Sequence, residues 1–524
     1  MTPTTTSTTA TPADPAQAPS TPPSSTTSTT PATAATTATA DGQDPWDLLV
    51  VGGGTAGLVA AKTAARFGAR VVLVERHRTG GDCLWTGCVP SKSLVAAAAR
   101  AAEVDRHEHL GVAGAAAEVD LPRLAQHWRS AIETIEPQDS PDSIRETGAQ
   151  VMAGRAVFTG ERTASVDGRA LTFRQALIAT GSAPTVPDLP GLASAGALTS
   201  EDLWSHLEAM PKLPRRLVVL GGGPIGCELG QALARLGVQV TLLHSGEHLL
   251  AREDPDASAV VRAALERDGV HVRTQTRASA VEPSGDGSGG VVLDDGTRLP
   301  YDRLLVALGR SARTAGLGLQ HAAVDLDERG HVRVDGHLRT SNPRVWAAGD
   351  VTGHPPFTHL AGVHGSLAAT NAVLGLRRRT DGIVPRVTFT DPEVAAVGVP
   401  SGPHLPEGLR TVTVEHAHLD RAVTEDRREG FTRLVLDRRS RIVGATIVGP
   451  RAGESLGEVV LALSQGLRTR DLAAATHAYP TFSDGVWNAA VSDVRQSLGE
   501  GPLARATRLL LAARRRWLDS PLAG

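Results

Sequence analysis

The sequence predicts an α/β fold with two three-layer domains, each built on a largely parallel sheet. Two stretches, residues 46–76 and 215–247, carry this prediction. Both show an apolar strand, glycines at GxGxxG spacing, a helix-like run and a second apolar strand, in the same order. Three later apolar segments, "ALIATGS", "LLVALGR" and "RVWAAGD", contain a glycine at or near their ends. Glycine at a strand end suits an edge of the sheet where a ligand approaches the backbone.

The first of the two stretches predicts a dinucleotide-binding site. Glycine permits the tight turn after the strand Leu48–Val51 and lets a pyrophosphate approach the N–H groups at the helix start. Glu75 ends the second strand, where a carboxylate can accept hydrogen bonds from an adenosine ribose. A purely structural turn is the alternative, but the complete order of elements argues against it. The predicted binding residues are Gly52, Gly54, Thr55, Ala56, Gly57 and Glu75.

The second stretch repeats the pattern and predicts a second dinucleotide site. Its residues are Gly221, Gly223, Pro224, Ile225, Gly226 and Glu228. The position that matches the acid of the first unit is His244. The glycine pattern favours NAD(H), but the missing carboxylate removes the usual discrimination against a 2′-phosphate. The choice between NADH and NADPH therefore stays open.

The three glycine-containing segments contribute further candidate cofactor-binding residues. These are Thr180, Gly181 and Ser182, then Gly309 and Arg310, then Gly349 and Asp350. A tight turn is a fair alternative for each segment taken alone.

Composition excludes several classes of protein. The 524 residues carry 53 basic and 56 acidic side chains, so the composition shows none of the excess positive charge typical of nucleic-acid-binding proteins. No apolar run approaches the roughly 20 residues of a membrane span. Three cysteines cannot form a secreted disulfide scaffold, so we expect a cytoplasmic protein in which a cysteine pair is catalytic or binds metal.

Both ends of the sequence are unusual. Residues 1–43, rich in Thr, Ser, Pro and Ala, predict a disordered tail, although a wrongly assigned start codon explains them equally well. Residues 497–524 predict a basic amphipathic helix with five arginines between Arg505 and Arg516. Such a helix can touch an acidic membrane or protein surface. We expect it instead to dock on its own subunit.

Two of the three cysteines, Cys83 and Cys88, stand five positions apart in "GGDCLWTGCVPSKSL". Within a regular helix this spacing is too wide for a disulfide, so the pair can bond only if the intervening segment is distorted, which Gly87 makes cheap. Cys88 is expected near a helix N-terminus, where a thiolate is favoured. No second cysteine motif completes a zinc site. Two idle thiols are the alternative to a redox pair.

"GGDCLWTGCVPSK" lies between the two GxGxxG units, and "ATGS", "ALGR" and "AAGD" follow in order. In this combination the chain resembles the class I pyridine nucleotide–disulfide oxidoreductases, which include dihydrolipoamide dehydrogenase, glutathione reductase and mercuric reductase. The resemblance runs from about residue 45 to residue 495. It implies FAD in the first unit, NAD(H) or NADP(H) in the second, and a C-terminal α+β dimerisation domain. A homodimer is therefore expected.

The resemblance also implies roles for individual residues. Cys83 and Cys88 would form a redox disulfide, with Cys88 facing the flavin and Cys83 exchanging with substrate. Lys92 would lie beside the flavin and pair with Glu228. Further contacts to FAD are implied for Glu75, Gly81, Lys92 and Asp350. The remaining cysteine, Cys227, is expected to be a packed, inert thiol.

The chain departs from the family pattern at the proton-transfer base. Members that act on small thiols have a His-Pro-Thr motif followed by a glutamate, and the partner subunit supplies that histidine. The matching stretch here is "ATHAYPTFSDGVW", with Tyr479 at the base position, Asp484 at the acid position and His477 two residues earlier. Tyrosine titrates near 10, so Tyr479 can donate a hydrogen bond but accepts a proton poorly at neutral pH. An aromatic residue that merely packs at an interface is the alternative.

The sequence thus predicts five segments. They are a tail at 1–43, an FAD domain at 44–205 and 303–380, an NAD(P) domain at 206–302, an interface domain at 381–496 and a basic tail at 497–524. The leading hypothesis is an FAD-dependent NAD(P)H oxidoreductase that acts on a small disulfide or dithiol. The alternatives are a reductase of a quinone or metal ion, and a flavin-containing sensor that turns over poorly.

Overall fold

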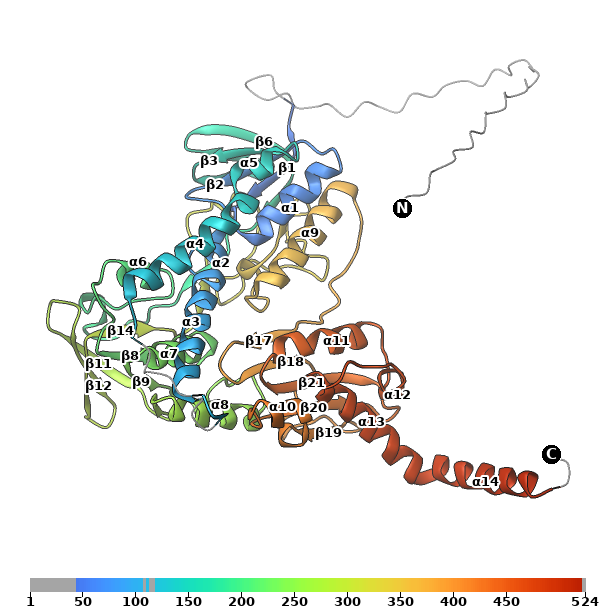
Figure 1. The fold of residues 1–524 in the computed structure, drawn as a ribbon. Coiled ribbons are helices and arrows are strands. Elements are labelled where there is room, and N and C mark those ends of the chain that lie inside the picture. The colour runs from blue at the N-terminus through green and yellow to red at the C-terminus, as the bar shows by residue number, and fades with distance from the viewer. Residues whose placement is uncertain (1–43, 107–109, 113–117, 521–524) are drawn as a thin grey trace, which may run out of the picture. The chain divides into compact units, whose positions relative to one another are not determined.

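The computed structural model describes residues 44–106, 110–112 and 118–520 (Figure 1). The segment 1–43, for which disorder was predicted, lies outside the described residues.

The first nucleotide-binding unit lies in a seven-stranded sheet with the order β3-β2-β1-β6-β5-β4, in which β16 also pairs with β6. Its strands are β1 (Trp46–Val51), β2 (Val71–Glu75), β3 (Gln150–Ala153), β4 (Ala156–Gly160), β5 (Thr163–Val166), β6 (Arg169–Ile178) and β16 (Val345–Ala347). The pairs β1–β2, β2–β3, β1–β6 and β6–β16 are parallel, whereas β4, β5 and β6 form an antiparallel meander. The parallel strands end together at one edge, which carries the candidate site.

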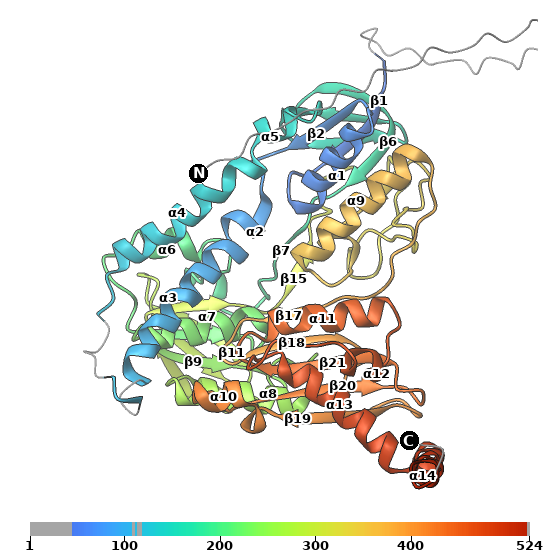
Figure 2. The same ribbon diagram turned by 45° about the vertical axis from the view of Figure 1, so that its right-hand side comes forward.

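Two alanine-rich helices, α1 (Thr55–Arg66) and α9 (Thr358–Leu374), lie side by side on one face of this sheet (Figures 1 and 2). Small side chains bring them close: a Cβ on Gly365 would stand 2.2 Å from the backbone oxygen of Ala56. The opposite face packs on the irregular segment 317–332. The alanines and glycines of α1 and α9 thus serve close packing, as alanine-rich buried helices generally do.

The second unit forms a separate four-stranded parallel sheet with the order β10-β9-β8-β14. Its strands are β8 (Arg216–Leu220), β9 (Gln239–Leu243), β10 (His271–Arg273) and β14 (Arg303–Val306), and its helices are α7 (Pro224–Arg235) and α8 (Pro255–Arg267). A three-stranded antiparallel sheet joins β10 to β14 along the chain: β11 (Ala278–Pro283), β12 (Gly289–Leu293) and β13 (Arg298–Tyr301). The domain boundary predicted at residue 303 is therefore wrong, because the chain makes one more parallel strand, β14, beside β8 before it leaves this domain.

Helices from the first domain reach the second. The helices are α2 (Gly81–Trp85), α3 (Cys88–Arg106), α4 (Leu121–Asp139), α5 (Pro141–Arg145) and α6 (Leu203–Glu208). Side chains of α3, α4 and α6 share one buried apolar cluster with α7 and the second sheet. A short antiparallel pair, β7 (Ser182–Pro184) with β15 (Arg310–Ala312), follows the ends of β6 and β14.

The C-terminal domain is an antiparallel five-stranded sheet with the order β17-β18-β21-β20-β19. Its strands are β17 (Arg386–Thr388), β18 (Glu393–Gly398), β19 (Arg410–Glu415), β20 (Phe431–Leu436) and β21 (Ile442–Gly449). Its helices are α10 (Asp420–Thr424), α11 (Ala452–Ser464), α12 (Thr469–Ala473) and α13 (Asp484–Gly499). Side chains of α11, α12 and α13 share one apolar cluster with the sheet, so this is an α+β domain with its own core.

The last helix, α14 (Gly501–Leu518), differs from the expectation. Every residue from Arg505 to Asp519 is exposed, and none of them belongs to an apolar cluster of the described residues. The predicted docking of this helix on its own subunit is therefore wrong. Among the described residues, no helix is both long enough and apolar enough to cross a bilayer.

Candidate active site

A cavity of about 1150 Å³ opens at the carboxyl edge of the first sheet and extends to α3 and the start of α7. It brings together most of the side chains and glycines that the sequence singled out. Those that line it are Gly52, Gly54, Thr55, Ala56, Glu75, Gly81, Cys83, Cys88, Lys92, Thr180, Gly181, Ser182, Pro224, Ile225, Glu228, Arg310, Gly349 and Asp350. Gly57, Gly221, Gly223, Gly226, His244, Gly309, His477, Tyr479 and Asp484 do not line it.

At one end of the cavity, glycines leave room for backbone approach. Gly52 has a φ of +110°, and a Cβ there would stand 2.4 Å from the oxygen of Ala179. A Cβ on Gly81 would come within 2.7 Å of the Cα of Gly54. Helix α1 starts directly after this turn, so its N–H groups face the same space. A turn with this backbone geometry, followed by a helix N-terminus, can hold a pyrophosphate.

Glu75 stands at the end of β2 beside this turn. One oxygen accepts a 2.6 Å hydrogen bond from the N–H of Gly53, and the other accepts a 2.8 Å bond from the N–H of His77. The carboxylate is thereby fixed at the cavity wall, where it can accept hydrogen bonds from ribose hydroxyls. The cavity's volume of about 1150 Å³ and its donor set therefore fit FAD.

A network of charged and polar groups lines part of the cavity. The hydroxyl of Ser182 donates a 2.6 Å hydrogen bond to Asp350, and Arg310 donates from Nε to the same hydroxyl at 2.7 Å. The guanidinium of Arg310 also pairs with Asp82. Asp350 is thus held by charge-assisted hydrogen bonds and faces the cavity as an acceptor for hydroxyl groups.

The segment between the two cysteines is not a continuous helix. Helix α2 ends at Trp85, and α3 begins at Cys88 after Thr86 and Gly87. A Cβ on Gly87 would stand 2.8 Å from the oxygen of Asp82, so the bend excludes a side chain there. The indole of Trp204 donates to the Thr86 carbonyl at 2.7 Å and holds the bend in place. This is the distortion that a Cys83–Cys88 disulfide requires.

In this structure both cysteines are free thiols, and their ionisation differs sharply. The hydrogen bond from Cys83 lowers the pKa of Cys88 to about 6, aided by the hydroxyl of Thr358 and the charge of Lys92, while burial opposes the shift. The same hydrogen bond, together with burial, raises the pKa of Cys83 well above its ordinary range. At neutral pH the pair therefore holds one thiolate, on Cys88, and one thiol, on Cys83.

Lys92 and Glu228 make the ion pair expected from the sequence. Nζ of Lys92 donates to Glu228 at 2.7 Å, and the other carboxylate oxygen accepts the N–H of Phe389 at 2.9 Å. Nζ also lies 4.3 Å from the centre of the Phe389 ring. The side chain of Glu228 is only 7% exposed, so Lys92 is anchored by a buried carboxylate next to the cysteines.

The second nucleotide-binding unit has the same backbone frame but a different side chain at its strand end. Gly221 has a φ of +116°, and a Cβ there would stand 2.3 Å from the oxygen of Ala307. Nδ1 of His244 accepts a 3.4 Å hydrogen bond from the N–H of Gly222, and Nε2 has no hydrogen-bond partner among the described residues. Cys227 is fully buried, its thiol donates to the Gly222 carbonyl, and burial raises its pKa above the ordinary range. It is an inert thiol.

The three residues around the expected base position lie in the C-terminal domain. Tyr479 is 72% exposed and donates its hydroxyl to Asp420, which raises the pKa of the tyrosine. Asp484 is buried at the start of α13 and accepts the N–H of Thr481 at 3.0 Å. Within the described chain these residues are not brought to the cysteines.

His477 is held at both ring nitrogens. Nε2 lies 2.7 Å from Glu458 and Nδ1 lies 3.1 Å from the carbonyl of Ala475. Burial lowers the pKa of His477, but the hydrogen bond and charge of Glu458 outweigh it, and the pKa is raised. An imidazole ring whose two nitrogens both face hydrogen-bond acceptors is stabilised as the cation. The cation has no free nitrogen to accept a further proton.

Sequence reasoning missed three partners of the predicted residues. Thr358, the first residue of α9, lies 3.7 Å from the sulfur of Cys88. Asp420 and Glu458 hold Tyr479 and His477 from positions 59 and 19 residues away. No local pattern marks such long-range partners.

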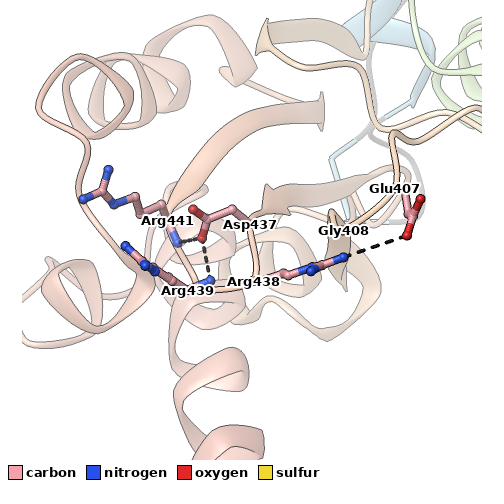
Figure 3. Close-up of a pocket in the computed structure, with 6 residues that line it drawn as sticks. All are labelled: Glu407, Gly408, Asp437, Arg438, Arg439 and Arg441. Carbon is pink, nitrogen blue, oxygen red and sulfur yellow. Dashed lines mark hydrogen bonds and ion pairs between the residues drawn. The ribbon is translucent and has the colours of Figure 1, made fainter.

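A second, open cavity of about 350 Å³ lies at the turn between β20 and β21, and Figure 3 shows its lining. It contains none of the predicted site residues. Asp437 accepts the N–H groups of Arg439 and Arg441, each at 2.8 Å, and Arg438 lies 3.9 Å from Glu407. These bonds build the hairpin turn, so the hollow is part of a solvated, arginine-rich loop.

Two dinucleotide cradles and a thiol pair at a cavity that fits FAD define a flavin- and nicotinamide-dependent oxidoreductase. Comparison with known proteins identifies the family. Residues 46–365 match the family model for pyridine nucleotide-disulphide oxidoreductases, and residues 384–490 match the dimerisation domain of the same family. The chain belongs to this family, whose cofactors are FAD and NAD(P)H, and it passes electrons between nicotinamide, flavin and a disulfide.

The similar proteins differ in what they act on. A mercuric reductase of Streptomyces lividans is 36% identical over 453 residues, which cover 84% of this chain and 94% of the relative. A dihydrolipoyl dehydrogenase of Thermus scotoductus is 35% identical, with 86% and 98% covered. Among solved structures, the HOCl-induced flavoprotein disulfide reductase RclA of Escherichia coli has a TM-score of 0.75 at 26% identity, with 85% and 99% covered.

Proposed function

We propose that this protein is an NAD(P)H-dependent reductase of a small disulfide, working as a homodimer with Cys83 and Cys88 as its redox pair. The observation that carries the proposal is the placement of both cysteines at the cavity that fits FAD, with Cys88 at the start of α3 beside Thr358. The unequal pKa values of the two thiols agree with different tasks for them. The thiolate of Cys88 is stabilised beside Lys92 at the cavity that fits FAD. The thiol of Cys83 is the member left to exchange with substrate.

The chemistry balances as a two-electron exchange. FAD, held in the cavity lined by Glu75 and Asp350, would supply the route by which two electrons pass from NAD(P)H to the Cys83–Cys88 disulfide. Cys83, after giving its proton to the Cys88 thiolate, attacks one sulfur of the substrate disulfide and forms a mixed disulfide, and one substrate thiolate leaves. Cys88, losing a proton to the departing thiolate, then attacks the sulfur of Cys83. This closes the Cys83–Cys88 bond and releases the second thiolate, which is protonated from solvent.

The surroundings of Cys88 support the forward direction. Lys92 stabilises the negative charge on Cys88, and Thr358 donates to the same sulfur. Glu228 keeps Lys92 in place. Tyr479, if the partner subunit presents it, would exchange its hydrogen bond to Asp420 for one to the leaving thiolate, and its raised pKa keeps it protonated for that role.

A second candidate function is reduction of a metal ion or a quinone. Two observations favour it: the base position holds Tyr479, and both nitrogens of His477 are engaged. Such acceptors need no histidine base. The similarity to mercuric reductase and to RclA, for which a Cu(II) complex is known, agrees with this candidate. The given sequence contains no cysteine after Cys227, so any metal ion would have to be reduced at the Cys83–Cys88 pair.

His244 bears on whether NADH or NADPH supplies the electrons. No carboxylate stands at the end of β9 to repel a 2′-phosphate, so we propose that NADPH and NADH are both accepted. Gly226 does not decide between them. A Cβ there would stand 1.9 Å from the oxygen of Gly221, and the same distance separates a Cβ on Gly57 from the oxygen of Gly52 in the first unit. Gly226 therefore serves the packing of the turn.

The purified flavoprotein, assayed with NADPH against lipoamide, glutathione disulfide, menadione and Hg²⁺, tests these assignments. For a disulfide substrate, Cys83→Ser and Cys88→Ser should each lower turnover by more than about 100-fold, since the covalent route is removed. Cys227→Ala is the matched control and should keep turnover within about threefold.

The same panel separates the candidates. Full menadione reduction by Cys83→Ser with no disulfide turnover in the parent protein would favour the second candidate. Failure of NADPH and NADH alike to bleach the flavin would contradict both and leave a sensor.

A further inference from the structure

Helix α14 presents an apolar surface that nothing in the described chain covers. Leu509 and Leu510 are 72% and 70% exposed, and Leu511, Trp517 and Leu518 are about half exposed. A helix of this length gains little stability alone in water, and most helices are held by an apolar face packed on something else. A partner surface for α14 is therefore expected.

The side chains of α14 are sorted around its axis. At 100° per residue, Arg505, Arg508, Arg515 and Arg516 fall within an arc of about 100°. The leucines, Trp517 and two alanines occupy the remaining arc of about 200°, interrupted by Arg514 and Thr507. The guanidinium of Arg514 lies 4.1 Å from the centre of the Trp517 ring, which leaves the ring and the charge side by side.

The charge of the helix selects the kind of surface. Between Ala504 and Ser520 there are five arginines and a single acidic residue, Asp519, whereas the chain as a whole carries a formal charge of −3. Leucines with a tryptophan on one side and arginines on the other are typical of helices that lie in the headgroup region of a membrane. There the leucines enter the acyl boundary, and the arginines reach lipid phosphates.

A second copy of the helix fits this surface less well. A two-helix seam buries only a narrow stripe at positions a and d. Here three consecutive leucines, residues 509–511, spread the apolar arc far beyond such a stripe. Pairing two copies would also bring two arginine clusters close together. We propose that α14 binds the surface of membranes rich in anionic lipid.

The test is co-sedimentation of the full-length flavoprotein with vesicles. Binding is expected to vesicles of phosphatidylcholine mixed with phosphatidylglycerol, to be weak with phosphatidylcholine alone, and to fall as salt is added. Reversing two charges in the double variant Arg515→Glu with Arg516→Glu should lower the partition coefficient by about 25-fold or more, since each arginine at an anionic surface contributes about fivefold. Leu510→Glu should weaken binding comparably, because it places a charge in the acyl boundary.

The matched control is Arg438→Glu with Arg439→Glu, which changes the net charge equally at the hairpin of Figure 3. It should bind vesicles as the parent does. Flavin content and NADPH oxidation should be unchanged in all three variants, which shows that they fold. Equal loss of binding in both double variants would overturn the proposal in favour of unspecific charge attraction. The proposal would also be overturned if the protein did not bind vesicles and instead formed an oligomer that Leu510→Glu dissociates. That result would show that α14 packs against a second copy of itself.

Discussion

The two nucleotide-binding units of this chain have the same glycine turn and differ in the side chain at or directly after the end of the second strand. The turns at Gly52 and Gly221 have φ values of +110° and +116°, and each excludes a Cβ by a neighbouring backbone oxygen. At the matching N–H group, the first unit places Glu75 at 2.6 Å and the second places His244 at 3.4 Å. From this comparison we propose that the glycine frame provides the phosphate cradle in both units, whereas the residue at or directly after the end of the second strand selects the ribose.

The largest expected effect comes from removing each glycine turn separately. Gly52→Ala should yield protein with little FAD, because a Cβ cannot fit beside Ala179 in the left-handed region. Gly221→Ala should keep FAD but lower kcat/KM for both nucleotides by about 100-fold, since the strain and clash fall on the second cradle alone. Absorbance spectra and steady-state kinetics measure the two outcomes.

Gly230→Ala is the control for this pair. A Cβ there meets Val240 and Leu242 at 3.6 and 3.7 Å, which is ordinary contact, so both properties should be kept. If Gly221→Ala also lost its flavin, the two cradles would not be independent.

An intermediate effect is expected from exchanging the side chain that differs. His244→Glu should lower kcat/KM for NADPH by about 100-fold, because a carboxylate repels the 2′-phosphate, and should leave NADH within about threefold. His271→Glu makes the same charge change at the opposite end of the neighbouring strand β10 and should change neither value. An equal loss for both nucleotides would show that His244 does not select the ribose.

The smallest effect concerns a contact that only the second unit makes. Glu228 on α7 has no counterpart on α1, where Val59 holds the matching position. Lys92→Met should destabilise the protein by about 1–2 kcal/mol, because it leaves a buried carboxylate without its cation while Lys92 itself is partly exposed. Urea unfolding monitored by flavin fluorescence measures it.

Asp142→Asn serves as its control. It removes an exposed pair with Arg145 and should cost under about 0.5 kcal/mol. Equal values for the two variants would mean that the Lys92–Glu228 pair is no more than a surface contact.

The features that sequence reasoning found share a local signature. The glycine turns, the strand ends at Glu75 and His244, and the break between Cys83 and Cys88 all follow from residues close in the chain. The features that it missed depend on residues far apart. The return of β14 to the second sheet and the hydrogen bond from Tyr479 to Asp420 are examples. The exposure of α14 was also missed, because an amphipathic pattern states that an apolar face exists and not what covers it.

The central claim is that Cys88 is the stabilised thiolate of a redox pair beside FAD. The direct measurement is the pH dependence of the long-wavelength absorbance that a thiolate gives next to oxidised flavin, recorded after addition of two electrons per FAD. Because the pKa of Cys88 is lowered, its thiolate is present above the midpoint and is protonated as the pH falls through it. The account predicts a midpoint at a pH of about 6, which rises in Cys83→Ala because the stabilising hydrogen bond is lost, and no such band in Cys88→Ser. A band that persists in Cys88→Ser, or a midpoint near the ordinary cysteine value of 9.0, would contradict it.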